Sequence, residues 1–162
     1  MTSEPPIDAI RHDLAEIASA DRSLKRFGAS RHRYALAPPG ELAASDLPDD
    51  YRRFVATIGT AGAGPYYGLV SATTTIEHPV DGPWGRGYVL GHVGCGYASI
   101  LATTGEVWLS AKPIGLVRPI RASFTEYYVT WLAQLAANEL PEAFVPPGVC
   151  ALANALGGYL GV

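Results

Sequence analysis

The chain is poor in cysteine, with Cys95 and Cys150 as the only two among its 162 residues. Two cysteines do not make the disulfide framework of a small secreted protein. The N-terminal sequence MTSEPPIDAIRHDLAEI has neither a basic run nor an apolar core, so we expect no secretory signal. These features favour a cytoplasmic protein.

The C-terminal tail, residues 141–162, is apolar but lacks the continuity of a membrane span. It carries no charged residue after Glu142, and it is interrupted by Pro146, Pro147, Gly148, Gly157 and Gly158. These residues break a spanning helix, and the apolar run that follows them is too short to cross a bilayer. We therefore expect no membrane association.

An excess of basic charge is also missing, because the formal net charge is −3. Proteins that bind nucleic acid carry a concentrated basic patch or stripe, so we expect no direct binding to nucleic acid. The charges that are present are slightly segregated. Between Ser30 and Phe54 the acidic residues are Glu41, Asp46, Asp49 and Asp50, with arginines around them.

Three segments have the apolar periodicity of helices. Residues 5–24 carry one apolar stripe, and LPDDYRRFVATIG begins with a proline and two aspartates suited to a first turn. In SFTEYYVTWLAQLAANEL, residues 123–140, Ser123 and Glu126 form a capping box. The wide apolar face of that segment predicts that it packs on a sheet. A last short helix is expected over residues 149–156.

The strands are expected in the middle of the chain. GLVSA, residues 68–72, is interpreted as a strand, and residues 78–87 as a loop. YVLGHVG, YASILAT and EVWLSA follow as successive strands, with a tight hairpin at Thr104 and Gly105 between the last two. Helices first, strands next and a helix last predict an α+β fold, with a central, mostly antiparallel sheet flanked by N-terminal and C-terminal helices.

The segment GHVGCG, residues 91–96, places His92 three residues before Cys95 among glycines. Their odd separation puts them on opposite faces of a strand unless a bulge at Gly94 intervenes. A thiol nucleophile, part of a metal site, and a small buried residue beside a close backbone contact are the three interpretations. The sequence offers neither four zinc ligands nor an orienting group, so it favours the last. We expect no catalytic residue, metal or cofactor.

Two glycine-rich segments remain. GTAGAGPYYG, residues 59–68, lacks the Lys-Ser/Thr pair of a P-loop and follows a helix instead of a strand, which favours a structural turn. DGPWGRG places Trp84 beside Arg86, the composition of a binding hot spot. Two alternatives stay open for Trp84: an exposed anchor, or a ring covered by its own loop.

Four segments occur in a recognisable order: LPDDYRRFVATIG, GAGPYYGL, GHVGCGYASILATTGEVWLS and SFTEYYVTWL. As an ordered set they resemble the SUKH superfamily over residues 41–135. The resemblance implies an α+β fold with a central sheet, flanking helices and no catalytic site. The length of the chain predicts a single domain over residues 1–162. The helix at 5–24 and the tail at 141–162 lie outside the resemblance. Bacterial members of this superfamily include immunity proteins that bind and block a cognate toxin.

The leading hypothesis is therefore a non-enzymatic protein-binding module of the immunity type. Many toxins act on nucleic acids through basic clefts, and an acidic surface steers association to such a cleft. The candidate partner-binding residues are Glu41, Asp46, Asp49, Asp50, Trp84 and Arg86. Two alternatives are an intracellular regulatory scaffold and a thiol- or metal-dependent enzyme built on His92 and Cys95.

Overall fold

The computed structural model describes residues 7–20, 35–43, 46–94, 96–111 and 114–137. The short helix expected at 149–156, the apolar tail and Cys95 lie outside the described residues. The ends of the helices expected at 5–24 and 123–140 lie outside them as well.

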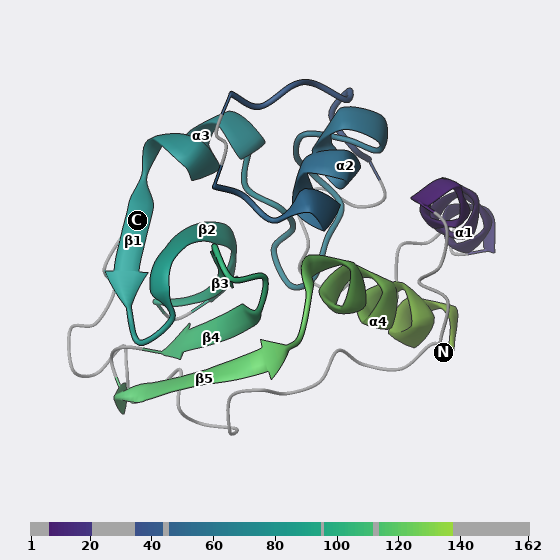
Figure 1. The fold of residues 1–162 in the computed structure, drawn as a ribbon. Helices are drawn as coiled ribbons and strands as arrows, with labels where there is room; N and C mark the ends of the chain where they lie inside the picture. The colour runs from purple at the N-terminus through teal and green to yellow at the C-terminus, as the bar shows by residue number, and fades with distance from the viewer. Residues whose placement is uncertain (1–6, 21–34, 44–45, 95, 112–113, 138–162) are drawn as a thin grey trace.

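A five-stranded antiparallel sheet forms the centre of the fold (Figure 1). Its strands are β1 (Pro79–Gly82), β2 (Gly85–Gly94), β3 (Tyr97–Ala102), β4 (Val107–Ala111) and β5 (Leu116–Arg121). They follow one another in space in the order of the sequence, each pairing with the next. Such a meander needs only short turns, and the expected hairpin at Thr104 and Gly105 joins β3 to β4, with Gly105 at φ 112°. The predicted antiparallel α+β fold is confirmed.

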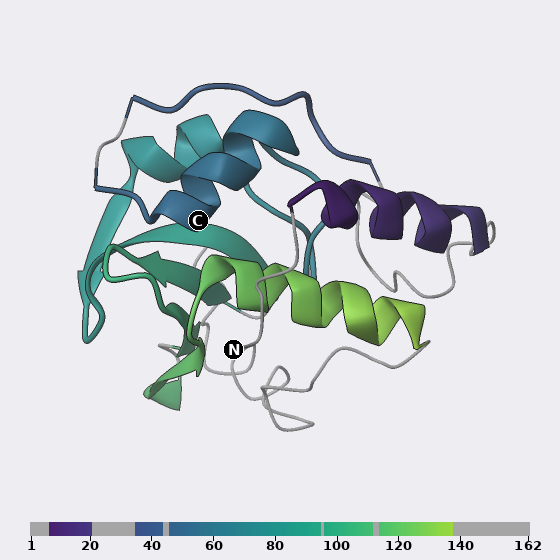
Figure 2. The ribbon, with the colours of Figure 1, turned by 45° about the vertical axis from the view of Figure 1, so that its right-hand side comes forward.

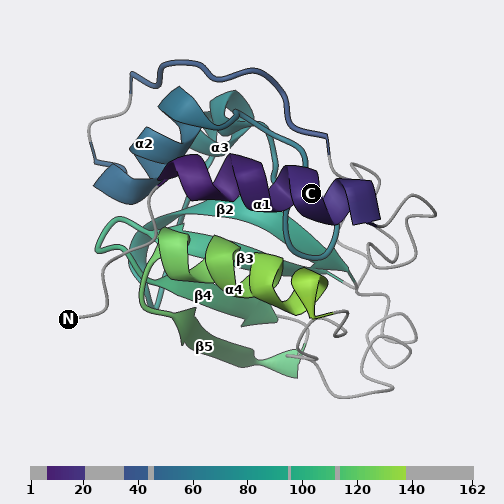
Figure 3. The same ribbon diagram turned by 90° about the vertical axis from the view of Figure 1, so that its right-hand side faces the viewer.

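The helices are α1 (Ile7–Ala20), α2 (Asp49–Thr57), α3 (Ala72–Glu77) and α4 (Phe124–Ala136). Figure 3 shows α1 and α4 in front of the strands and α2 above β2, and apolar side chains of all three helices share the main core with Tyr88, Leu101 and Val107 of the sheet. The helices α1 and α4 run alongside each other in Figures 2 and 3. A side-chain nitrogen of Arg11 in α1 donates to the Thr57 carbonyl, which ties α1 to the C-terminal end of α2.

Aromatic side chains of α2 and α4 form the centre of the main core. The Phe124 ring lies 4.9 Å from that of Tyr51 and 5.0 Å from that of Phe54, with edge-to-face geometry in both pairs. Tyr128 extends the cluster to Phe54 at 4.7 Å and to Trp131 at 5.2 Å. Edge-to-face aromatic pairs stabilise a core beyond the area that they bury. The apolar face predicted for α4 is therefore buried as expected.

Polar contacts fix the N-terminal end of α4. The Glu126 amide donates to the Ser123 hydroxyl at 3.0 Å, which is the first half of the predicted capping box. The Glu126 carboxylate accepts from the Ala122 amide at 2.7 Å, one residue before the position that a standard box uses. Two otherwise unpaired backbone donors are satisfied in this way.

The opposite face of the sheet carries a second, smaller apolar cluster. Its buried members are Trp84, Ile100 and Ala102, and Trp108 packs against them. Side chains alternate along a strand, so Val107 and Leu109 face the helices while Trp108 faces away. The apolar face of α4 therefore packs on the predicted sheet, on the side of Val107 and opposite to the side of Trp108.

Several elements differ from the sequence prediction, among them α3, which lies in a segment with no predicted helix. GLVSA is not a strand, because Leu69 makes only an isolated bridge with Gly62 and Ser71 precedes α3. The segment expected as a loop at 78–87 contains β1, whose sequence PVDG is rich in residues that strands avoid. The edge strand β5 contains Pro119, which is tolerated because an edge strand has one side without ladder hydrogen bonds.

Replacing Trp131 with Ala tests the packing of α4. The ring is 4% exposed, so Trp131→Ala is expected to lower the free energy of unfolding by about 3–5 kcal/mol, the usual range for a buried aromatic. Chemical denaturation of the variant and of the control Arg53→Ala, which removes an exposed side chain of α2, measures the difference. A Trp131→Ala protein as stable as the control would show that α4 is not part of the core.

Stability is expected to fall steeply in alkaline solution. Burial raises the pKa of Tyr51 to about 12, and it raises the pKa values of Tyr127 and Tyr128 well above 10. Above pH 10 the unfolded chain loses these protons while the folded chain keeps them. Each group then lowers the free energy of unfolding by about 1.4 kcal/mol per pH unit.

The stabilising contribution of Tyr51 is thus complete below pH 10 and is lost as the pH rises toward 12. Urea titrations at several pH values from 9 to 12 should give a shallower decline for Tyr51→Phe than for the parent. Equal slopes would mean that the Tyr51 phenol ionises as readily in the folded protein as in the unfolded chain.

Candidate functional site

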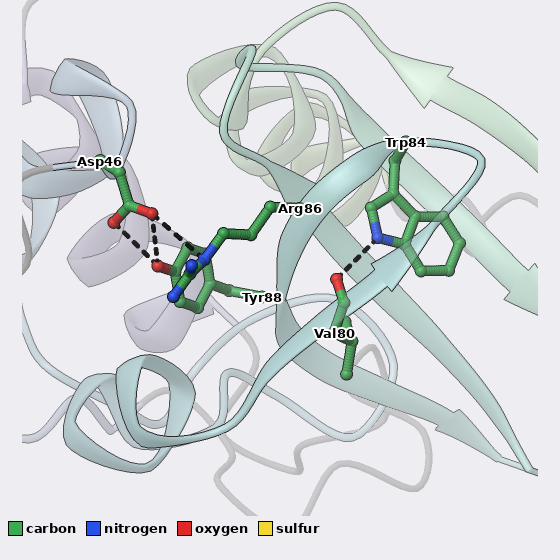
Figure 4. Close-up of polar contacts among 5 residues, drawn as sticks. All are labelled: Asp46, Val80, Trp84, Arg86 and Tyr88. Carbon is green, nitrogen blue, oxygen red and sulfur yellow. Dashed lines mark hydrogen bonds and ion pairs between the residues drawn. The ribbon is translucent and has the colours of Figure 1, made fainter.

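Asp46, Arg86 and Tyr88 form a polar cluster at the edge of the molecule, which we call the Asp46 cluster (Figure 4). The Tyr88 hydroxyl lies 2.8 Å from each carboxylate oxygen of Asp46 and donates to it. The Arg86 Nε lies 3.4 Å from Asp46 Oδ2. The side chains of Arg86 and Asp46 are 57% and 42% exposed, so a partner can reach both charges.

The β1–β2 hairpin holds the Arg86 end of this cluster in place. Arg86 pairs with Asp81 across the hairpin, and its carbonyl accepts from the Thr103 amide at 3.0 Å. Tyr88 lies two residues further along β2, on the same face of the strand, and its ring is buried in the main core. A charged group on the surface is thus fixed by a ring in the core.

The Tyr88 phenol remains a hydrogen-bond donor at neutral pH. Burial, followed by the hydrogen bond to the Asp46 carboxylate, raises the pKa of Tyr88. The protonated phenol therefore orients the Asp46 carboxylate at the surface. This arrangement presents a positioned anion beside a cation, a pattern suited to binding a charged partner.

The other acidic residues predicted from the sequence have different surroundings. Asp49 is 83% exposed and forms a helix-surface ion pair with Arg52. Glu41 is exposed. The segment that carries it is held against α2 by the Gly40 amide, which donates to the Val55 carbonyl at 3.0 Å. Both carboxylates are accessible to a partner.

Asp50 has a role inside the fold. Its Oδ2 accepts from the Thr125 amide at 2.8 Å and from the Thr125 hydroxyl at 3.2 Å, at the positive end of α4. Its Oδ1 accepts from the Tyr51 amide at 2.8 Å. The half-buried carboxylate therefore joins α2 to α4.

Trp84 is buried, at 5% exposure, so its interpretation as an exposed anchor is wrong. Its Nε1 donates to the Val80 carbonyl at 3.0 Å within the β1–β2 hairpin. The ring lies against Gly82 and Gly87, where an added Cβ would meet it at 2.5 and 2.8 Å. The glycines around the tryptophan thus make room for a ring covered by its own hairpin, and Figure 4 shows it apart from the Asp46 cluster.

The segment around His92 shows the irregularity that its glycines suggest. The register between β2 and β3 shifts between Val89 and Gly91, and again between His92 and Gly94. A Cβ on Gly91 would lie 2.5 Å from the Gly68 carbonyl oxygen, so the two backbones approach closely there. His92 is half-buried in β2. Within the described residues, no three His, Cys, Asp or Glu side chains gather as metal ligands would.

The glycine loop at 59–68 uses its backbone amides within the fold. The Gly62 amide donates to the Leu69 carbonyl at 3.2 Å, and the Ala63 amide donates to the Ala35 carbonyl at 2.8 Å. Gly62 has a φ of 113°, and its backbone touches Ala35 so closely that a side chain would not fit. These contacts are those of a structural turn.

Comparison of the chain with protein-family models, curated proteins and solved structures gives no match. Of the helices that the structure describes, none combines the length and the apolar character needed to span a membrane.

Sequence reasoning missed Tyr88 as part of the site. The alternation of β2 assigns Tyr88 and Arg86 to one face, and that signal is available from the sequence. The contact of Tyr88 with Asp46, forty-two residues earlier in the chain, cannot be predicted from the sequence pattern. It requires knowledge of where the segment before α2 lies relative to β2.

Replacing Trp84 with Ala is expected to destabilise the hairpin, by about 3 kcal/mol or more for a buried aromatic. Trp84→Phe keeps an aromatic ring but loses the hydrogen bond to Val80, which contributes about 1 kcal/mol. Urea denaturation of both variants gives the two values. If Trp84→Ala unfolds at the same urea concentration as the parent, the indole is not a core residue and returns to the binding candidates.

Proposed function

We propose that the protein is a non-enzymatic binding module that neutralises a cognate toxin domain by stoichiometric contact. The observation that carries this proposal is the Asp46 cluster, in which a buried phenol orients an exposed carboxylate beside an exposed arginine. Charged groups held in place before binding lose little freedom when a partner arrives. The cluster is therefore suited to recognising a folded, charged surface.

The charge of the neighbouring surface supports a basic partner. Asp49 is exposed and lies three residues after Asp46 in the sequence. Asp81 is exposed and pairs with Arg86 across the β1–β2 hairpin. The chain as a whole has a net charge of −3. Acidic surfaces raise the association rate with basic ones by electrostatic steering. A toxin domain that acts on nucleic acid presents such a basic cleft.

The resemblance of residues 41–135 to the SUKH superfamily supports the immunity role, carried out in the cytoplasm. A regulatory scaffold for the cell's own proteins is the second candidate. Gene order separates them, because an immunity gene adjoins a toxin gene and a housekeeping scaffold has no such neighbour. An enzyme based on His92 and Cys95 would lose its activity in Cys95→Ala, whereas toxin binding is expected to survive that change.

Titration of the toxin domain encoded beside this gene tests the proposal. One equivalent of the protein is expected to abolish the toxin's activity. The double variant Asp46→Asn/Asp49→Asn is expected to bind about 10-fold more weakly, mainly through slower association at low salt. Stopped-flow binding at two salt concentrations separates association from dissociation.

Asp13→Asn is the matched control, because Asp13 is exposed on α1, away from this surface. Asp13→Asn removes one negative charge, where the double variant removes two, and it is expected to change binding by less than twofold relative to the parent. A toxin that stays fully active with excess protein would refute the immunity role. Equal effects of Asp13→Asn and the double variant would refute the assignment of the Asp46 cluster.

A further inference from the structure

Tyr66 has a backbone conformation that side-chain-bearing residues rarely adopt. Its φ is 57°, and no other non-glycine residue in the described part of the chain has a positive φ. It occupies the first central position of a turn closed by the Gly68 amide, which donates to the Pro65 carbonyl at 3.1 Å. Turns with positive φ at that position strongly favour glycine, asparagine or aspartate. A tyrosine there carries backbone strain.

The strained turn is fixed firmly to the irregular half of β2. The Tyr67 amide donates to the His92 carbonyl at 3.4 Å, and the Val70 amide donates to the Leu90 carbonyl at 2.8 Å. The close approach of Gly68 to Gly91 leaves no room between the two backbones. The turn therefore has a defined position relative to the sheet.

This turn presents an aromatic ring to solvent. Tyr67 is 40% exposed, and it is the one large hydrophobic side chain exposed to that degree among the described residues. A tyrosine on a fixed backbone offers a large contact area, a polar hydroxyl and little entropy to lose. Tyrosine is also enriched among the residues that dominate binding energy at protein interfaces.

The surroundings of the ring point to a protein as its partner. The segment from Phe54 to Ile76 contains no charged residue. A surface that stacks on nucleic acid needs cations for the phosphates, and this segment supplies none. An uncharged aromatic projection instead fits an apolar pocket on a folded protein, with an acceptor at its rim for the phenol.

We propose that the turn Pro65–Gly68 is a second protein-contact site, in which the Tyr67 ring enters an apolar pocket of the partner. The partner is the toxin domain, so this proposal rests on the proposed function. Arg86 and His92 are six positions apart along β2, which places the two contact sites at most about 20 Å apart along the strand at ~3.3 Å per residue. Two sites at that separation fit within one interface of standard size.

Photo-crosslinking in cells tests the contact directly. The photoreactive residue p-benzoylphenylalanine is placed at position 67, and at exposed position 73 of α3 as the control. Irradiation is expected to link one protein at position 67 and to leave position 73 unlinked, and mass spectrometry identifies the linked protein. Absence of any product at 67 above that at 73 would overturn the proposal.

The linked protein is then purified and titrated with the variants. Tyr67→Ala is expected to raise Kd about 30-fold or more, as for a dominant interface residue, with an unchanged melting temperature. Tyr67→Phe, which keeps the ring, is expected to lose much less, and Thr73→Ala is expected to lie within twofold of the parent. A Kd for Tyr67→Ala within threefold of the parent would overturn the proposal.

The outcomes separate the two proposals. If the adjacent toxin stays active with excess protein, and Tyr67→Ala weakens binding to a different linked protein, the contact site stands while the immunity role fails. If the protein neutralises the toxin and Tyr67→Ala does so equally well, the immunity role stands while the contact site fails.

Discussion

The rest of the structure depends on how α4 packs on the sheet. Its aromatic face meets α2 through Phe124 and Tyr128 and meets β3 through Tyr127, whose hydroxyl donates to the Ser99 hydroxyl at 3.0 Å. The Tyr128 hydroxyl donates to the Ala63 carbonyl at 2.8 Å, so the same helix also fixes the glycine loop. Polar atoms buried this deeply stabilise only when they are paired. The core of this protein thus determines where its loops lie.

Strand β2 connects the core to both proposed contact sites on the surface. Near its beginning, the buried Tyr88 ring positions the Asp46 carboxylate, and near its end the Leu90 and His92 carbonyls accept from the turn that bears Tyr67. The first half of β2 pairs with β1, whereas beyond Tyr88 that edge of β2 is used by residues 67–70. Both proposed contact sites therefore rest on one strand, and neither needs to order itself on binding.

The sequence predicts the parts of the fold that depend on periodicity. The buried faces of α2 and α4 and the strands β2, β3 and β4 follow from patterns of 3.6 and 2 residues. The parts it misses are short and made of residues with weak or contrary preferences, such as PVDG in β1 and the proline-containing β5. Such strands form because a neighbouring strand pairs with them, and pairing is a tertiary event that local propensity does not encode.

The candidate site shows the same limit at the level of single side chains. Composition leaves two alternatives open for Trp84, an exposed anchor and a ring covered by its own loop, and only the structure shows that Gly82 and Gly87 leave the space that its indole fills. The glycine-rich turn was interpreted as purely structural, yet it presents Tyr67 to solvent. Glycine next to an aromatic residue has two opposite consequences: it can make room for the ring or tighten the backbone that displays it. Gly82 and Gly87 make room for the Trp84 ring, whereas Gly68 and Gly91 let two backbones approach beside the exposed Tyr67, and only the tertiary structure distinguishes the two cases.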